Sequence, residues 1–257
     1  MIFVVLVSAL ILGGIFTNLP LDQYYTNMQV YQYIWKSFIL IDNPGANTLP
    51  NVFNNFPVNG PMWTLAYEVK MYISLALIWF VCSLFKRNNI IFKYSIFAIT
   101  LLLIVSDLYF NTYIYTEKWI FRLGCMFFIG GSFWLLKDKI VVSHKIFILI
   151  LAIICVSFLS HNRLLLNLVY NVTLVYVVLY LAYVPTGVIR KYNLIGDYSY
   201  GIYIGHGPIQ RSIIALTPAI TPIMLSIVSL IVSIIFAIFS WHTIEKKAKM
   251  AKTIVTK

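Results

Sequence analysis

The chain has 257 residues, of which 61% are hydrophobic and only 11% are charged, and its formal net charge is +11. Ordinary soluble domains contain about 25% charged residues, so this composition excludes a typical soluble protein and predicts an integral membrane protein. In such a protein an excess of Lys and Arg is typical of the loops on the cytoplasmic side of the membrane. We therefore expect the lipid bilayer, and no nucleic acid, among the partners.

The predicted elements are eight apolar segments, most of them close to the roughly 17 to 25 residues that a membrane-spanning helix needs. They predict an all-α fold: a polytopic bundle of about eight transmembrane helices that forms a single domain over residues 1–257. The predicted spans cover residues 1–17, 62–85, 94–110, 119–136, 145–160, 164–184, 195–216 and 222–241.

Between the first two spans, residues 18–59 form a long polar and aromatic connection. Its segment MQVYQYIWKSFILI, residues 28–41, is apolar but is interrupted by Gln32 and Lys36. This pattern suits an interfacial or re-entrant helix better than a span. We therefore expect an outer connection that carries an interfacial helix.

Lys and Arg residues gather in alternate connections. Clusters follow the second, fourth, sixth and eighth spans, and the other connections have none. By the positive-inside rule, this alternation with an even number of spans predicts both termini in the cytoplasm and residues 18–59 outside. The clustered residues are Lys86, Arg87, Lys93, Lys137, Lys139, Lys145, Arg190, Lys191, Lys246, Lys247, Lys249, Lys252 and Lys257.

Gly60 and Pro61 mark the start of the helix that contains the second span, because proline at the first helical position gives up only an amide that lacks a partner anyway. Glu68 and Lys70 lie within its first turns, although a charge at mid-span costs roughly 2.5 to 3.5 kcal/mol. A carboxylate there is a candidate functional residue. Arg122 lies at a similar depth in the fourth span, so Glu68 and Arg122 either form a structural ion pair or line a polar cavity for a ligand.

His206 lies in the middle of the seventh span, among Gly201, Gly205 and Gly207 and two residues before Pro208. Proline removes an i to i−4 hydrogen bond and allows a kink. A histidine at such a break is either a general base for an acceptor hydroxyl or a core histidine that bonds a freed carbonyl. Tyr200, one of the tyrosines at this span end, fits an interfacial belt and equally a sugar site.

Four stretches resemble, in the same order, motifs of the acyltransferase 3 family of polytopic membrane acyltransferases. The first, GPMWTLAYEVKMY at residues 60–72, is similar to the family signature G-x-[LM]-W-[ST]-L-x-x-E-x-x-x-Y. The others are FRLGCMFFIG at residues 121–130, GDYSYGIYIGHGPI at residues 196–209 and SWHTIEK at residues 240–246. The resemblance spans nearly all of the chain, with gaps.

The resemblance implies an acyltransferase of the bacterial inner membrane type that modifies surface polysaccharides or lipids. Its donor would be acetyl-CoA or another acyl-CoA, with no bound cofactor, and its acceptor would be a hydroxyl of a glycan or a lipid-linked sugar. Trp63, Glu68, Tyr72 and Arg122 would line the site. Glu68 and His206 are the catalytic candidates, and Tyr200 joins the candidate substrate-binding residues.

The family's first span carries a histidine, preceded by an arginine, that is thought to supply the base, and an Arg-rich segment follows its second span. This sequence has neither and opens in what resembles the family's third span. We therefore expect an N-terminally truncated relative: a fragment, a truncated reading frame or a variant with another base, such as His206. Two rival functions stay open, a transporter or flippase of a lipid-linked glycan with Glu68 and Arg122 on its path, and a non-catalytic fragment.

Overall fold

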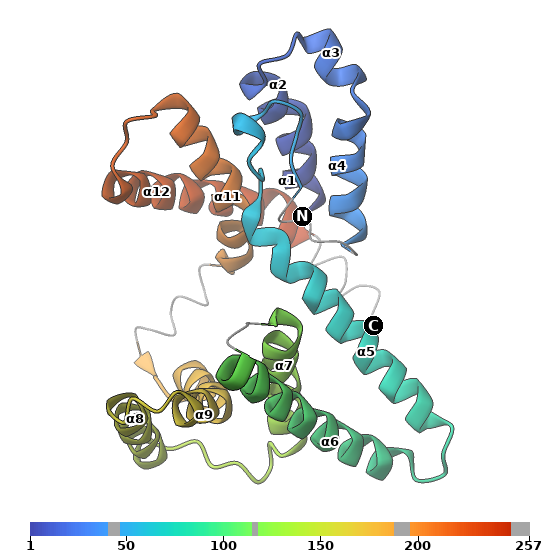
Figure 1. The fold of residues 1–257 in the computed structure, drawn as a ribbon, viewed down its shortest axis with the longest axis vertical. Coiled ribbons are helices and arrows are strands. Elements are labelled where there is room, and N and C mark those ends of the chain that lie inside the picture. Colours follow the sequence, from blue (N-terminus) through green and yellow to red (C-terminus); the bar gives the residue numbers. More distant parts are fainter. Residues whose placement is uncertain (41–46, 115–117, 188–195, 248–257) are drawn as a thin grey trace. The chain divides into compact units, whose positions relative to one another are not determined.

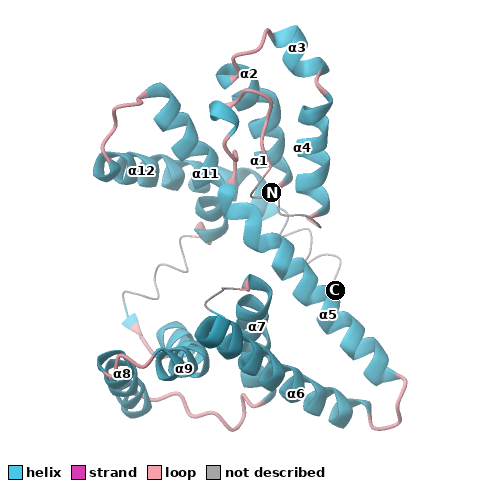
Figure 2. Ribbon diagram, in the orientation of Figure 1, coloured by secondary structure: helices cyan, strands magenta, loops and turns pink. Residues whose placement is uncertain are grey.

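The computed structural model describes residues 1–40, 47–114, 118–187 and 196–247, and each predicted span contains a helix (Figure 1). Within these ranges, Figure 2 shows helices and loops and no strand. The chain divides into two compact units, and each is described by itself. The first unit comprises Met1–Val69 and Tyr192–Lys257, and the second unit is Lys70–Lys191. The single membrane domain expected from the sequence stays a prediction.

The first unit opens with one continuous helix of three parts, called the N-terminal helix below. Its parts are α1 (Ile2–Leu6), a π-helical segment (Val7–Leu12) and α2 (Gly13–Phe16). Two helices of the connection follow, and α4 lies against α1 (Figure 1). They are α3 (Leu21–Thr26) and α4 (Met28–Ile39).

The π-helical segment is held from the side by two tyrosines. The Tyr24 hydroxyl donates to the Ala9 carbonyl oxygen and the Tyr25 hydroxyl to the Leu10 carbonyl oxygen, both at 2.7 Å. Gly13 allows the approach of Tyr24, because a Cβ at position 13 would lie 1.8 Å from the Tyr24 hydroxyl oxygen. π-helical turns are rare and need such extra contacts, so the irregular turn depends on residues outside its own helix.

The helix predicted for residues 28–41 is confirmed as α4, which ends at Ile39 because Leu40 is in the left-handed region, with φ 56°. Its N-terminus is capped by Asn27, whose side-chain oxygen accepts from the Gln29 amide at 2.9 Å. One face is buried and the other is exposed, as amphipathic spacing requires. Val30, Tyr33 and Ser37 are buried, whereas Met28, Tyr31 and Trp35 are exposed. Its place at a membrane surface remains a prediction, and residues 41–46 lie outside the described ranges.

Three further helices complete the first unit. A single 3₁₀ turn (Gly60–Met62) leads into α5 (Trp63–Ser83), whose first residues belong to this unit. Near the C-terminus, α11 (Ser199–Leu216) and α12 (Pro222–Ser240) pack side by side, and a π turn (Trp241–Glu245) follows α12. They approach closely at Gly201, where an added Cβ would lie 2.8 Å from the Ala237 Cα.

The second unit consists of the rest of α5 and four more helices. They are α6 (Asn88–Tyr109) with its π-helical extension (Phe110–Ile114), α7 (Trp119–Leu135), α8 (His144–Leu159) and α9 (Arg163–Tyr183). Its core is formed by Met71, Ile96 and Phe128, with partly buried apolar residues around them. The starts of α7, α8 and α9 lie within one residue of the predicted starts, and α6 begins six residues earlier than predicted.

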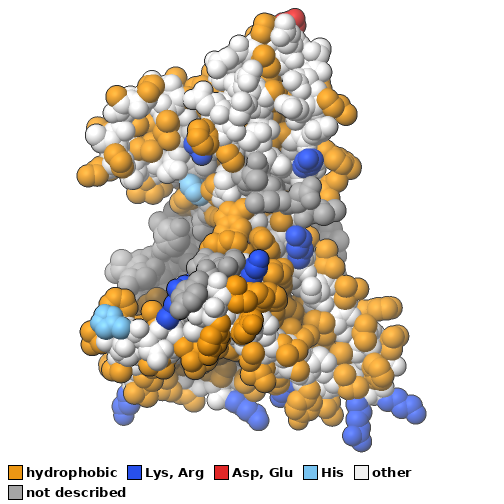
Figure 3. Space-filling view, in the orientation of Figure 1, with side chains coloured by type: hydrophobic (Ala, Val, Ile, Leu, Met, Phe, Trp, Pro, Cys, Tyr) orange, Lys and Arg blue, Asp and Glu red, His pale blue; other side chains and the backbone are white. Residues whose placement is uncertain are grey.

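In the described part of the chain, four helices are long and apolar enough to cross a membrane. They cover Gly60–Ser83, Asn88–Ile114, Arg163–Tyr183 and Pro222–Glu245, and Ile2–Phe16, Trp119–Leu135 and His144–Leu159 are shorter apolar helices. Apolar side chains also cover the exposed faces of helices in both units (Figure 3). Such surfaces are typical of a membrane protein. The count of eight spans and the cytoplasmic placement of both termini remain predictions.

Candidate functional site

Two of the motif stretches recognised in the sequence meet in the first unit, at the start of α5. The Tyr203 hydroxyl on α11 donates to the Pro61 carbonyl oxygen and also bonds the Thr64 hydroxyl. Gly207 lets the turn come close, since a Cβ there would lie 2.9 Å from Asn59 Oδ1 and 2.9 Å from Pro61 Cδ. The turn before α5 is therefore fixed to the middle of α11.

The break that Pro208 makes in α11 is filled by a side chain. Proline has no amide hydrogen, so the Ile204 carbonyl four residues earlier loses its helical donor. Asn59 supplies one, because its Nδ2 donates to the Ile204 carbonyl oxygen at 2.9 Å, and Asn59 is buried. An unpaired buried carbonyl costs about 1–3 kcal/mol, so this contact stabilises the kinked helix.

The stretch at residues 240–246 joins the same unit. A Cβ at Gly196 would lie 2.7 Å from Trp241 Nε1, and the Tyr198 and Trp241 rings meet edge to face at 6.4 Å. Glu245 Oε1 accepts from the Ser240 hydroxyl at 2.7 Å. The stretches at residues 196–209 and 240–246 and most of the stretch at 60–72 thus lie in the first unit, whereas residues 70–72 and 121–130 belong to the second unit.

A groove of about 610 Å³, with several polar side chains in a largely apolar lining, lies between α11 and α12. Its polar side chains come from both helices, with hydroxyls from one face of α12 and an imidazole, a phenol and an amide from α11. The serines at 226, 229 and 233 repeat at helical spacing, so all three lie on one face. The lining residues are Ser199, Ile202, Tyr203, His206, Gln210, Ser226, Ser229, Leu230 and Ser233.

His206 is held in one tautomer. Its Nδ1 lies 2.8 Å from the Tyr203 carbonyl oxygen and 3.1 Å from the Ile202 carbonyl oxygen. A carbonyl oxygen only accepts, so Nδ1 must carry the hydrogen, and in the neutral ring Nε2 is then the proton-accepting nitrogen. His206 thus bonds backbone carbonyls, but those of Tyr203 and Ile202 and not the Ile204 carbonyl freed by Pro208, and its role as a general base stays a prediction.

Hydrogen-bond donors lie near this histidine. Ser233 is only 1% exposed, and its hydroxyl has no hydrogen-bond partner among the described residues. Gln210 donates from Nε2 to the Ser229 hydroxyl at 3.5 Å, the long limit for such a bond. A buried hydroxyl without a partner costs free energy unless a water or a ligand satisfies it, and Ser233 is one of several such groups among the described residues.

The other predicted site residues of the first unit lie outside this groove. Glu68 is exposed, and its carboxylate interacts electrostatically with the phenols of Tyr200 and Tyr203. Trp63 is half-buried and meets the Tyr67 ring edge to face at 5.8 Å.

Tyr72 and Arg122 belong to the second unit. The exposed Tyr72 ring meets Phe127 edge to face at 5.5 Å. The Arg122 guanidinium carbon lies 5.5 Å from the centre of the Tyr170 ring, a cation–π contact. Because Glu68 and Arg122 lie in different units, their predicted pairing or shared cavity stays a prediction.

The second unit contains a buried carboxylate, Asp107, outside the candidate groove. Asp107 is 3% exposed, and its two oxygens accept from Asn111 Nδ2 and from Asn171 Nδ2, both at 2.8 Å. The i, i+4 spacing of Asp107 and Asn111 is visible in the sequence, but Asn171 comes from α9. No group of three His, Cys, Asp or Glu side chains that could hold a metal ion is found in the described ranges.

No family model, no curated protein and no solved structure matches the chain. The likeness of its four sequence stretches to acyltransferase 3 proteins therefore stays a prediction.

Proposed function

We propose that the chain is a membrane acyltransferase that moves an acyl group, most simply acetyl, from acyl-CoA to a hydroxyl of a glycan or a lipid-linked sugar. The observation that carries the proposal is the tautomer of His206. Its Nδ1 hydrogen is committed to backbone carbonyls, and Nε2 is left to accept a proton in a groove lined by hydroxyl groups. A fixed imidazole next to a site for a polar ligand is what general-base activation of a hydroxyl requires.

The proposed reaction is a single displacement at a thioester. Nε2 of His206 takes the proton of the acceptor hydroxyl as its oxygen attacks the acyl carbonyl, forming the new C–O bond. The negative charge on the carbonyl oxygen is met by donors of the groove, the Ser233 hydroxyl and the Gln210 amide. The C–S bond then breaks, and the imidazolium returns its proton to the CoA thiolate, so that an ester and free CoA result.

The remaining candidates take supporting roles in this proposal. Glu68, through its electrostatic interaction with Tyr203, would orient the acceptor at one end of the groove. Trp63 and Tyr200 would offer aromatic surface to a sugar ring, and roles for Arg122 and Tyr72 of the second unit rest on the family likeness alone. By the family likeness, the membrane would be the inner membrane of a bacterium.

The test is a transfer assay with radiolabelled acetyl-CoA. Membranes that contain the full chain are incubated with the label, and their lipid and glycan fractions are treated with mild alkali, which cleaves oxygen esters. We expect alkali-labile label and an equal amount of free CoA, above the level in membranes without the chain. Absence of both products would refute the proposal, and uptake of a lipid-linked glycan into vesicles in their place would establish a transporter.

A further inference from the structure

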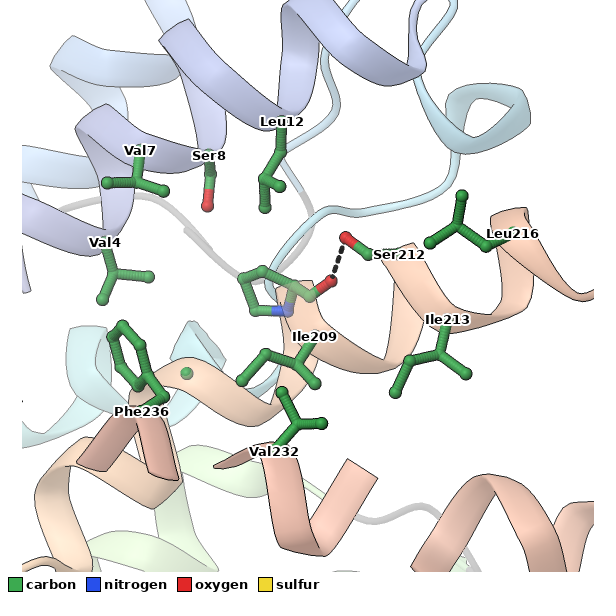
Figure 4. A pocket seen from close by; sticks show the side chains of 12 residues that line it. Val4, Val7, Ser8, Leu12, Ile209, Ser212, Ile213, Leu216, Val232 and Phe236 are labelled. Atoms are coloured by element: carbon green, nitrogen blue, oxygen red, sulfur yellow. Dashed lines mark hydrogen bonds between the residues drawn. The ribbon is translucent and has the colours of Figure 1, made fainter. Parts of the chain in front are cut away.

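An apolar groove of about 280 Å³ lies between the N-terminal helix, α11 and α12. Figure 4 shows the side chains of Val4, Leu12, Ile209 and Leu216 around it. One of its few polar groups, the Ser212 hydroxyl, is already bonded to the Pro208 carbonyl oxygen at 2.9 Å, as the dashed line in Figure 4 marks. The groove therefore offers an occupant apolar contact and little hydrogen bonding.

A second cavity, of about 460 Å³ and of mixed polarity, is lined in part by residues of two of these helices, the N-terminal helix and α11. The N-terminal helix contributes residues 4–12 to the apolar groove and then Ile15 and Phe16 to this cavity. On α11 the two sets of lining residues overlap in sequence: the groove is lined between Gly205 and Leu216, and Arg211, Ile214 and Ala215 line the cavity from another face of the helix. The side-chain amides of Asn18 and Asn54 complete its polar part.

Arg211 is the charged group of this cavity. Its guanidinium carbon lies 4.9 Å from the centre of the Phe56 ring, and no ion pair or hydrogen bond of its side chain is found among the described residues. A half-buried guanidinium with free N–H donors matches the planar, two-oxygen face of a phosphate. The opposing loop holds Asn54 in the left-handed region, with φ 54°. Backbone strain of this kind persists where the surroundings enforce it, often at ligand sites.

We propose that the first unit binds one anionic phospholipid, with an acyl chain in the apolar groove and the phosphate at Arg211. The positive charge of Arg211 favours an anionic headgroup over a zwitterionic one, and the apolar groove lined by the same two helices favours a lipid over a soluble phosphate compound. Burial of each CH₂ group favours the chain in the groove, and the charge-assisted bonds favour the headgroup in the cavity. The site uses none of the groups assigned to acyl transfer, so the two proposals fail or succeed separately.

The test is native mass spectrometry of the full chain in mild detergent, with phosphatidylglycerol and phosphatidylcholine of identical acyl chains. We expect one phosphatidylglycerol to be retained in preference to phosphatidylcholine. Arg211→Gln is expected to lower this preference about tenfold, as for loss of one bidentate charged contact. Lys36→Gln, which removes an exposed charge from the same unit, should leave the preference unchanged, and Arg211→Lys should keep most of it.

The acyl groove is tested on α12. Val232→Trp places a large side chain at a lining position and should reduce retention of both lipids, whereas Ile231→Trp, at an exposed neighbour outside the lining, should not. Circular dichroism confirms that each variant is folded.

Glycerol phosphate, a headgroup without acyl chains, separates the two possible sources of the phosphate. Failure to displace the lipid at millimolar concentration supports the lipid site. Displacement together with no effect of Val232→Trp would overturn it in favour of a soluble phosphate. Equal retention of both lipids by the unaltered chain would overturn it as well.

Discussion

The side chain of Asn59 replaces a backbone donor that Pro208 lacks. Its Nδ2 donates to the Ile204 carbonyl oxygen at 2.9 Å, four residues before Pro208 in α11. The two residues are far apart in the sequence, and each is incomplete without the other: the proline leaves a buried carbonyl unpaired, and the asparagine buries an amide that needs an acceptor.

Asn59→Leu should therefore lower the free energy of unfolding by about 1–3 kcal/mol, because the Ile204 carbonyl loses its donor. In a Pro208→Ala background the restored amide can serve this carbonyl, so the same substitution should cost about 1 kcal/mol less. Unfolding in detergent micelles, followed by circular dichroism, measures all four variants of this double-mutant cycle. Additive effects of the two substitutions would contradict the relationship.

Because α11 and α12 pack closely at Gly201, adding a single methyl group at this position should lower the stability of the chain. A Cβ at position 201 would lie 2.8 Å from the Ala237 Cα, and backbone cannot rotate away as a side chain does. Gly201→Ala should cost about 1–3 kcal/mol, as overpacking does. Gly130→Ala on α7, where no atom lies within 4 Å of the added Cβ, should instead be neutral or stabilise by about 0.5–1 kcal/mol. Similar thermal midpoints for the two variants would exclude close packing at residue 201.

Replacing the carboxylate of Asp107 by an amide of nearly the same shape should strongly lower the free energy of unfolding. Both carboxylate oxygens accept from asparagine amides, so Asp107→Asn places an NH₂ group opposite another NH₂ group. We expect a loss of about 1–3 kcal/mol in the free energy of unfolding. Asp138→Asn, at an exposed position of the same unit, should change it by less than about 0.5 kcal/mol. If the two variants unfold alike, the Asp107 cluster does not stabilise the second unit.

The buried phenol of Tyr24 should make the folded chain less stable at alkaline pH. Burial raises the pKa of Tyr24 above its ordinary value of 10.0, so the folded chain keeps the phenol proton when the unfolded chain has lost it. The contribution is complete below about pH 10 and decreases as the pH rises above that value, by up to about 1.4 kcal/mol per pH unit. Unfolding midpoints between about pH 8 and pH 11.5 should fall more steeply for the unaltered chain than for Tyr24→Phe. Parallel curves would show that Tyr24 is not responsible.

The helices were largely predictable from the sequence because apolar runs and capping residues are local signals. The segment at residues 28–41 predicted α4 to within two residues of its observed end. The π-helical segment of the N-terminal helix was not predictable, since it depends on hydroxyls from Tyr24 and Tyr25 in the following connection. A pattern within one helix carries no information about a donor that arrives from another.

The candidate site was predictable only in part. The break at Pro208 drew attention to His206, but the tautomer of the ring depends on which carbonyls its Nδ1 meets in the folded helix. The serine spacing at 226, 229 and 233 is a sequence signal that was not used, and it marks the α12 face of the groove. The emphasis on Glu68 came from the cost of a charge in a span, which does not reveal that the side chain is exposed.

Acetyl transfer by His206→Asn, compared with His161→Asn, tests the central claim most directly. An asparagine amide at position 206 can still donate to the Tyr203 carbonyl oxygen, as Nδ1 does, but it has no basic nitrogen in place of Nε2. His161 is exposed in a loop outside the groove and provides the matched control. We predict that His206→Asn folds normally and loses acetyl transfer about 10²- to 10⁴-fold, while His161→Asn keeps the rate of the unaltered chain. An unchanged rate in a folded His206→Asn protein would contradict the claim that this histidine activates the acceptor.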